Sequence, residues 1–323
     1  MHATRRTPPR WWVLGPATAV ALAVPVILAT RWGPIVASQP AYLLTLLLVG
    51  AVSVVGLAWS LVDIGRERPR VRERSRFRVV GSRVLGVAGT VVLVAGLAWL
   101  RPLPATDVAV AAMSGGPAVR VVDSSTRIEL LPTGHAAATG LIFYPGALVD
   151  PRAYVPLLTP LAADGFPVVV VKPPYGIALL ATGAASGIIG SIPAVHRWVV
   201  GGHSLGGVAA TSYAGAGHAS VDGLLLWTSY PNGSIASATS LQVTSVSAGN
   251  DGLATPSKIE ASKHDLPPDT RFVTVEGAVH AYFGDYGTQR GDGTPTISRA
   301  DAQRQIESAS LDLLRRVDRR SGP

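Results

Sequence analysis

Trp-Val-Val-Gly-Gly-His-Ser-Leu-Gly-Gly, residues 198–207, is the stretch that decides the fold. Residues 198–200 form a short apolar run, which predicts a buried strand that ends at two glycines. Residues 202–206 match the pattern Gly-x-Ser-x-Gly of a nucleophile elbow, in which a serine lies on a sharp turn between a strand and a helix. The small residues from Leu205 onward predict the start of that helix. Ser204 is therefore the candidate nucleophile.

The spacing of this motif has steric and electrostatic reasons. A serine at the apex of a tight turn has strained backbone geometry, and the neighbouring positions must carry almost no side chain so that strand and helix can pass closely. The N-terminus of the helix then points at the serine and favours negative charge there. The N–H of Leu205 is the first expected donor of an oxyanion hole.

The composition divides the chain into two parts. Hydrophobic residues make up 48% of the 323 residues and charged residues only 15%. Residues 1–101 contain 13 arginines, no lysine and three acidic residues, whereas residues 102–323 contain 15 basic and 17 acidic residues. The positive charge therefore belongs to the N-terminal third, which argues against nucleic-acid binding by a folded basic domain. The absence of cysteine excludes disulfides and thiol chemistry.

Three long apolar runs occupy the first hundred residues, at about 11–30, 42–62 and 81–100. Each is about 20 residues long, and such a helix spans about 30 Å of hydrocarbon. Buried core helices are the alternative, but the surrounding sequence has too few polar residues to cover them. We expect residues 1–101 to form a membrane anchor of three transmembrane helices, joined by a linker at 102–118 to a catalytic domain at 119–323.

The arginines predict the orientation of the anchor. Arg5, Arg6 and Arg10 precede the first run, and seven arginines lie in the loop 66–78 between the second and third. The positive-inside rule places both segments in the cytoplasm and the catalytic domain outside, in a multi-pass protein of the plasma membrane. Three alternatives stay open: a signal peptide in place of the first span, an inverted topology, and contact of the loop arginines with anionic lipids.

The C-terminal part predicts an α/β fold with a mostly parallel sheet. Residues 119–123 and 127–131 alternate apolar with polar side chains, as in a hairpin at a half-exposed sheet edge. Continuous apolar runs separated by helical stretches then predict parallel strands covered by helices on both faces. These runs are at 141–144, 168–171, 198–200, 224–227, 243–246 and 272–275, and helices are expected at 154–164, 205–214, 256–263 and 299–316.

The exits of the predicted strands supply the other candidate catalytic residues, because ligands of such sheets bind at the carboxyl ends of the strands. Asp251 and His280 follow two of these strands, so the chain order is Ser204, Asp251, His280, as in a catalytic triad with His280 as base and Asp251 as its orienting acid. A glycine turn after the strand 141–144 provides the second oxyanion donor, the N–H of Ala147 or alternatively of Gly146.

Other histidines and one acidic residue are weaker candidates for these roles. His264 is an alternative base, although it lies at an expected exposed helix end, and His203 is expected to pack inside the elbow or to line the site. Asp285 is expected to stabilise a turn, with substrate binding as the alternative. The apolar residues 177–189 are consistent with an acyl pocket, with membrane contact or with simple packing on the sheet.

Four stretches resemble the α/β-hydrolase superfamily: residues 140–146, 200–207, 249–255 and 276–287. The likeness is strongest to small, lidless bacterial hydrolases related to dienelactone hydrolases and simple esterases, and it covers roughly residues 119–314. It implies the fold, Ser204 as nucleophile, Asp251 as acid and His280 as base, but no substrate. Dienelactone hydrolases proper use a cysteine nucleophile, which this chain lacks, so their substrate is not implied.

The sequence as a whole predicts a membrane-anchored serine hydrolase, in particular a carboxylesterase that forms an acyl-enzyme; thioesters and amides are alternative substrates. A small-molecule or lipid ester is the expected substrate, and neither a metal nor an organic cofactor is required. The alternative is a catalytically inactive hydrolase fold that acts as a binding or sensory module at the cell envelope.

Overall fold

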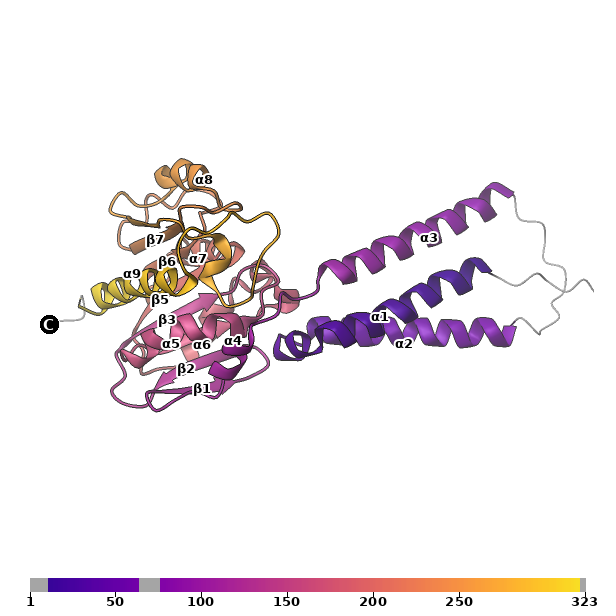
Figure 1. Ribbon diagram of the computed structural model, residues 1–323, viewed down its shortest axis with the longest axis horizontal. Helices are drawn as coiled ribbons and strands as arrows, with labels where there is room; N and C mark the ends of the chain where they lie inside the picture. The colour runs from indigo at the N-terminus through magenta and orange to yellow at the C-terminus, as the bar shows by residue number, and fades with distance from the viewer. Residues whose placement is uncertain (1–10, 64–75, 320–323) are drawn as a thin grey trace, which may run out of the picture. The chain divides into compact units, whose positions relative to one another are not determined.

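The computed structural model describes residues 11–63 and 76–319 of the chain. Apart from residues 37–39, the chain separates into two compact units at the peptide bond between Arg101 and Pro102 (Figure 1). The orientation prediction rests on Arg5, Arg6, Arg10 and the arginines of the loop 66–78. All of these except Arg76 and Arg78 lie outside the described residues.

The first unit contains three helices, α1 (Trp11–Ala37), α2 (Ala41–Asp63) and α3 (Arg76–Trp99). All three are long and apolar enough to cross a membrane. Helix α1 extends beyond the expected end at residue 30 to Ala37, but the backbone at Arg31 departs from helical angles (φ −138°, ψ 22°). The sequence prediction of three long apolar helices is confirmed.

The apolar side chains of these helices point outward more than inward. Leu48 and Val55 on α2 and Leu85 and Val92 on α3 all expose more than three fifths of their surface. Some apolar side chains are buried between the helices, among them Val24 on α1, which packs against Gly50 on α2. The Tyr42 hydroxyl donates to the Leu97 carbonyl of α3 at 2.6 Å. Exposed apolar surface of this extent is typical of helices that contact lipid.

The second unit is built on one sheet of eight strands, in the order β1-β2-β4-β3-β5-β6-β7-β8. The pairs from β4 to β8 are all parallel, whereas β1 and β2 form an antiparallel hairpin whose strand β2 joins β4 in antiparallel register. The predicted sheet, with its hairpin at one edge, is confirmed. The strands are β1 (Val119–Asp123), β2 (Arg127–Pro132), β3 (Thr139–Tyr144), β4 (Val168–Val171), β5 (Arg197–His203), β6 (Val221–Trp227), β7 (Gln242–Ala248) and β8 (Arg271–Val275).

Helices cover both faces of this sheet, as the continuous apolar strands require. Leu141 and Phe143 of β3 point into a core closed by α5 and α9, whereas Ile142 and Tyr144 point into a second core closed by α6 and α7. The helices of this unit are α4 (Asp107–Ala112), α5 (Val155–Ala163), α6 (Ala184–Ser191), α7 (Leu205–Ala214), α8 (Pro256–Ala261) and α9 (Arg299–Arg319).

Two segments for which the sequence predicted no regular structure contain short helices. The stretch 102–118, interpreted as a linker, contains helix α4, which begins with Thr106 as its N-cap, and it forms part of the second compact unit. The apolar stretch 175–191, left unassigned from the sequence, forms two short 3₁₀ turns and helix α6, with Ala178 and Ile188 packed in the core beside α7. Its buried residues agree with the packing alternative, but Leu179 and Leu180 remain exposed.

Candidate active site

Ser204 lies on a sharp turn between β5 and α7, with φ 53° and ψ −122°. A positive φ is rare for a residue with a side chain and marks a turn held by its surroundings. Here the Ser204 N–H donates to the Trp227 carbonyl at 3.0 Å, and the Ser229 hydroxyl donates to the Ser204 carbonyl at 2.7 Å. Both bonds connect the elbow to the exit of β6. The local geometry is that of the nucleophile elbow predicted from the sequence.

The glycines around Ser204 are required by close backbone contact. A Cβ at Gly206 would lie 2.0 Å from the Tyr144 carbonyl oxygen, and a Cβ at Gly202 would lie 2.4 Å from the Gly206 carbonyl carbon. No side chain fits at such distances. Helix α7 therefore begins directly against the loop that leaves β3, which brings Ser204 beside the predicted oxyanion loop.

The predicted acid and base are paired. His280 Nδ1 and Asp251 Oδ2 are 2.9 Å apart, and both side chains are essentially buried. The other Asp251 oxygen accepts the N–H groups of Leu253 at 2.7 Å and Ala254 at 2.8 Å, so the loop after β7 fixes the carboxylate. A carboxylate in this position holds the Nδ1 proton of the imidazole and leaves Nε2 as the basic nitrogen.

His203 connects the position of Ser204 with that of His280. The imidazole of His203, which precedes Ser204, lies 4.5 Å from that of His280 between ring centroids. In the described part of the chain, the Ser204 hydroxyl makes no hydrogen bond. The hydrogen bond between a catalytic serine and its histidine base is often long before substrate binds. The structure thus gathers the three candidate residues at one end of the sheet and pairs two of them directly.

The loop after β3 is held by hydrogen bonds on both sides. The Gly146 N–H donates to the Tyr154 hydroxyl at 2.8 Å, the Leu148 N–H to the Gly176 carbonyl at 2.8 Å, and the Val149 N–H to the Gly146 carbonyl at 3.2 Å. Pro145 has no N–H. The Ala147 N–H is left without an acceptor among the described residues. Of the two alternatives from the sequence, Ala147 is therefore the free donor and Gly146 is already used.

The start of α7 supplies further free donors. The N–H groups of Leu205 and Gly206 have no acceptor among the described residues, whereas the Gly207 N–H bonds the Ser204 carbonyl. Unpaired N–H groups at the first turn of a helix are available to a ligand. Ala147 and Leu205 thus carry the unpaired N–H groups that an oxyanion hole requires.

His203 is a buried neutral group beneath the site, as one of the sequence alternatives has it. Its side chain is fully buried, and Nδ1 lies 2.9 Å from the Tyr154 hydroxyl, while Nε2 has no partner in the described chain. Burial, together with the neighbouring His280, lowers the pKa of His203 well below its ordinary value. Burial also raises the pKa of Tyr154, so the phenol stays protonated. His203 therefore packs between Tyr154 and His280.

Asp292 is a site residue that the sequence analysis missed. Its Oδ1 accepts the N–H groups of His280 at 3.1 Å and Gly252 at 3.3 Å, and its Oδ2 accepts that of Ala281 at 2.8 Å. One carboxylate therefore holds the acid loop and the base loop together. The sequence Gly-Asp-Gly at 291–293 has no pattern that distinguishes it from an ordinary turn, because the contact depends on where the loop between β8 and α9 returns.

Other predicted candidates lie elsewhere. His264 is on the surface, with its side chain 79% exposed, and does not reach the site. Asp285 has a structural role: its N–H donates to the Ala153 carbonyl, its carbonyl accepts from Thr106, and its carboxylate accepts from Gln303 at 3.2 Å. These contacts agree with turn stabilisation rather than substrate binding.

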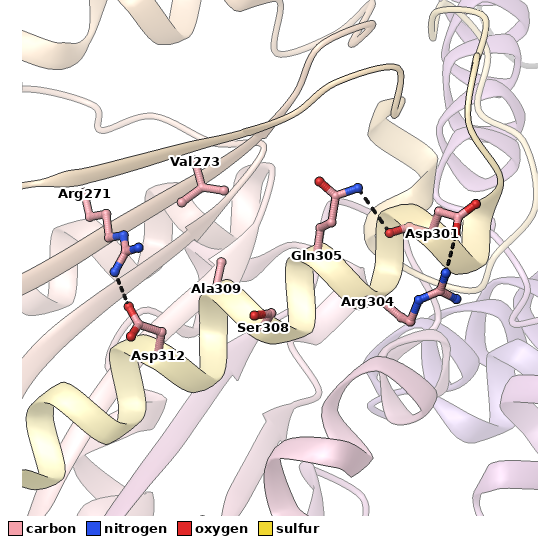
Figure 2. A pocket seen from close by; sticks show the side chains of 8 residues that line it. All are labelled: Arg271, Val273, Asp301, Arg304, Gln305, Ser308, Ala309 and Asp312. Atoms are coloured by element: carbon pink, nitrogen blue, oxygen red, sulfur yellow. Dashed lines mark hydrogen bonds and ion pairs between the residues drawn. The ribbon is translucent and has the colours of Figure 1, made fainter.

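A separate hollow of about 690 Å³ lies between α9 and β8, away from these residues (Figure 2). Its charged groups are already paired, Arg271 with Asp312 and Arg304 with Asp301. The four charged side chains of the hollow are therefore already used in ion pairs. The lining residues are Arg271, Val273, Asp301, Arg304, Gln305, Ser308, Ala309 and Asp312.

A parallel sheet with helices on both faces and a strand–serine–helix elbow defines the class of α/β hydrolases. The sequence profile of the alpha/beta hydrolase family matches residues 140–305, more than half of the chain, and the chain belongs to this family. The family assignment made from the sequence is confirmed. No match is found among curated proteins.

Two solved structures with related folds are both distant. A protein of Klebsiella pneumoniae subsp. pneumoniae MGH 78578, provisionally assigned as a dienelactone hydrolase, shares 13% identity with a TM-score of 0.46, over 58% of this chain and 92% of its own. A hydrolase of Thermoplasma acidophilum, whose CIB-like class is itself a prediction, shares 14% identity with a TM-score of 0.47, over 61% of this chain and 97% of its own. No substrate is transferred from either.

Proposed function

We propose that this α/β hydrolase is a membrane-anchored serine hydrolase, specifically a carboxylesterase that works through an acyl-enzyme. The observation that carries the proposal is the convergence of three features at one end of the sheet: the elbow at Ser204, the buried Asp251–His280 pair, and the unpaired N–H groups of Ala147 and Leu205. These are the nucleophile, the oriented base and the oxyanion donors that acyl transfer requires.

The proposed reaction has two steps, and in each of them His280 first accepts a proton and then returns it. In the first, Ser204 Oγ attacks the carbonyl carbon of the ester while its proton passes to His280 Nε2, and the Ala147 and Leu205 N–H groups bind the resulting oxyanion. Collapse of this intermediate breaks the bond to the alcohol, which leaves with the proton from His280. In the second, water attacks the acyl-enzyme in the same way and releases the acid and Ser204.

The proposed substrate class rests on two features: the connection from β6 to β7 holds no cap domain, and apolar side chains are exposed in a neighbouring segment. Only residues 228–241 connect β6 to β7, and this is too short to fold as a separate cap domain. Gly176, whose carbonyl holds Leu148 of the oxyanion loop, is followed by the exposed Leu179 and Leu180. An apolar surface beside the acyl-transfer site favours a lipophilic ester, such as a lipid of the cell envelope.

The cellular location is proposed from α1, α2 and α3 and from the arginines. Three helices of sufficient length and apolarity support a membrane anchor. The positive-inside rule supports a plasma-membrane protein with its N-terminus in the cytoplasm and the hydrolase unit outside.

Labelling with a fluorophosphonate probe tests the nucleophile. The wild-type full chain in isolated membranes should be labelled, Ser204→Ala should not, and the matched control Ser308→Ala, at an exposed serine of α9, should be labelled like wild type. Hydrolysis of short-acyl nitrophenyl esters should fall by at least about 10³-fold in Ser204→Ala. A folded wild-type chain that neither reacts with the probe nor hydrolyses esters would favour the inactive binding or sensory module instead.

A further inference from the structure

The stretch that follows the third apolar helix is hydrogen-bonded to the oxyanion loop. Helix α3 ends at Trp99, and Leu103 forms an isolated parallel bridge with Val149. The Leu103 N–H donates to the Leu148 carbonyl at 2.7 Å, and the Leu103 carbonyl accepts the Asp150 N–H at 3.0 Å. Both backbone groups of Leu103 are therefore used by the loop that carries Ala147.

The residue held by Leu103 has an unusual backbone conformation. Leu148 has φ 61°, a left-handed value that costs free energy for any residue with a side chain and persists only when the surroundings impose it. Two bonds impose it here: the Gly176 carbonyl accepts the Leu148 N–H, and the Leu103 N–H binds the Leu148 carbonyl. Without the bond from Leu103, the peptide group after Leu148 would be held only by the Val149 N–H, which donates to the Gly146 carbonyl at 3.2 Å.

Ala147 lies between the fixed points of this loop. The Gly146 N–H on one side is bound by the Tyr154 hydroxyl, and the Leu148 N–H on the other by the Gly176 carbonyl. The Ala147 N–H between them has no acceptor among the described residues, so its direction is set by its neighbours alone. Donors of an oxyanion hole act through such preorganised direction rather than through binding strength.

We propose that Leu103 is a positioning residue for the oxyanion donor of Ala147, so that the segment joining the membrane helices to the hydrolase unit also shapes the active site. This inference rests on the proposed function. It acts through the Leu103 N–H and carbonyl, whereas the Leu103 side chain only packs against the hydrophobic core. The stretch 102–106 then contributes to the active site in addition to connecting the apolar helices to the hydrolase unit.

The test removes the N–H of Leu103 in the full chain. Leu103→Pro deletes this donor, and Pro104 already disfavours the helical region for residue 103, so the substitution keeps this residue in the extended region that a proline can adopt. We expect kcat for a short-acyl nitrophenyl ester to fall about tenfold or more, with KM changed less than about threefold. The matched control is Ala136→Pro, at an exposed residue whose N–H donates no hydrogen bond in the described chain, and it should leave both constants unchanged.

Two further variants separate the backbone from the side chain. Leu103→Ala keeps both backbone groups and should lose much less activity than Leu103→Pro. Leucic acid at position 103, introduced by nonsense suppression, replaces only the N–H by oxygen and should reproduce the Leu103→Pro loss even if the proline variant does not fold.

Inhibition by a trifluoromethyl ketone distinguishes positioning from a general loss of structure. The ketone forms a tetrahedral adduct with the serine and uses the oxyanion donors, so its Ki should rise in Leu103→Pro in proportion to the loss of kcat/KM. If Leu103→Pro folds and keeps the kcat and Ki of wild type, the inference about Leu103 is overturned, whereas the proposed hydrolase activity is unaffected. An equal loss in Leu103→Ala would overturn the inference too. If wild type is not labelled at Ser204, the proposed function itself fails, and that outcome is visible before any variant is compared.

Discussion

His203 contacts both sides of the candidate site. Its ring packs against that of His280 at 4.5 Å and lies parallel to Phe283 at 6.1 Å, while Nδ1 reaches the Tyr154 hydroxyl that holds Gly146. A charged imidazole in this position would be fully buried beside His280, the proposed base, and burial disfavours the charged form. The neutral form is therefore the one that the fold requires, as the lowered pKa indicates.

The neutral state of His203 predicts a pH dependence of stability. Below the ordinary pKa of 6.5, the unfolded chain binds a proton at His203 and the folded chain does not, so the free energy of unfolding falls as pH falls. The contribution is up to about 1.4 kcal/mol for each pH unit below that value. The free energy of unfolding, measured in urea, should be lower for His203→Asn than for wild type at both pH 7.5 and pH 5.0. Its decrease from pH 7.5 to pH 5.0 should be smaller in His203→Asn than in wild type. The exposed control His264→Asn should keep the wild-type difference, and an unchanged difference in His203→Asn would contradict the prediction.

At the scale of elements, the sequence predicted those parts of the site that local pattern determines. Ser204, Asp251 and His280 each follow an apolar strand directly, and the end of a strand can be recognised from a few neighbouring residues. The edge hairpin and the parallel strands were predictable for the same reason. The pairing of His280 with Asp251 followed from the rule that such strands end at the same edge of the sheet.

The remaining parts depend on contacts between segments that are distant in the sequence. Leu103 meets Leu148, and Asp292 meets Gly252, through backbone groups that every residue possesses. In the sequence, Tyr154 is only an aromatic residue at the start of an apolar helix. The structure shows that its hydroxyl binds the Gly146 N–H. No local pattern distinguishes these residues, so only the folded arrangement identifies them.

The loop between β8 and α9 gives a prediction at this scale. Asp292 accepts N–H groups from the acid loop and the base loop, and Asp292→Asn replaces one acceptor oxygen by an NH₂ group that faces other donors. We expect the free energy of unfolding to fall by about 1–3 kcal/mol. Ester hydrolysis should slow about tenfold, because His280 is less firmly placed. Thermal unfolding and kcat measure the two effects.

The control for this substitution is Asp269→Asn, the same change at an exposed aspartate before β8. It should alter neither stability nor kcat. If Asp292→Asn behaved like Asp269→Asn in both measurements, the carboxylate would not be what joins the two loops.

At the scale of the whole molecule, charge and apolarity are divided between the two units. The N-terminal third carries the excess of arginine, and its helices α1, α2 and α3 expose apolar side chains, whereas the hydrolase unit has slightly more acidic than basic residues. A bilayer would cover the exposed apolar surface, and an arginine-rich loop is costly to move across it. The distribution of residue types thus favours one orientation for the entire chain.

Cysteine labelling tests this orientation on a clean background, because the chain has no cysteine of its own. Ser308→Cys places a thiol on an exposed position of α9, and Ser75→Cys places one in the arginine-rich loop. With an impermeant maleimide on intact cells, Ser308→Cys should react and Ser75→Cys should react only after permeabilisation, since the positive-inside rule predicts a cytoplasmic location for the arginine-rich loop. The reverse pattern would mean an inverted topology, which would place the hydrolase unit and its ester substrate inside the cell.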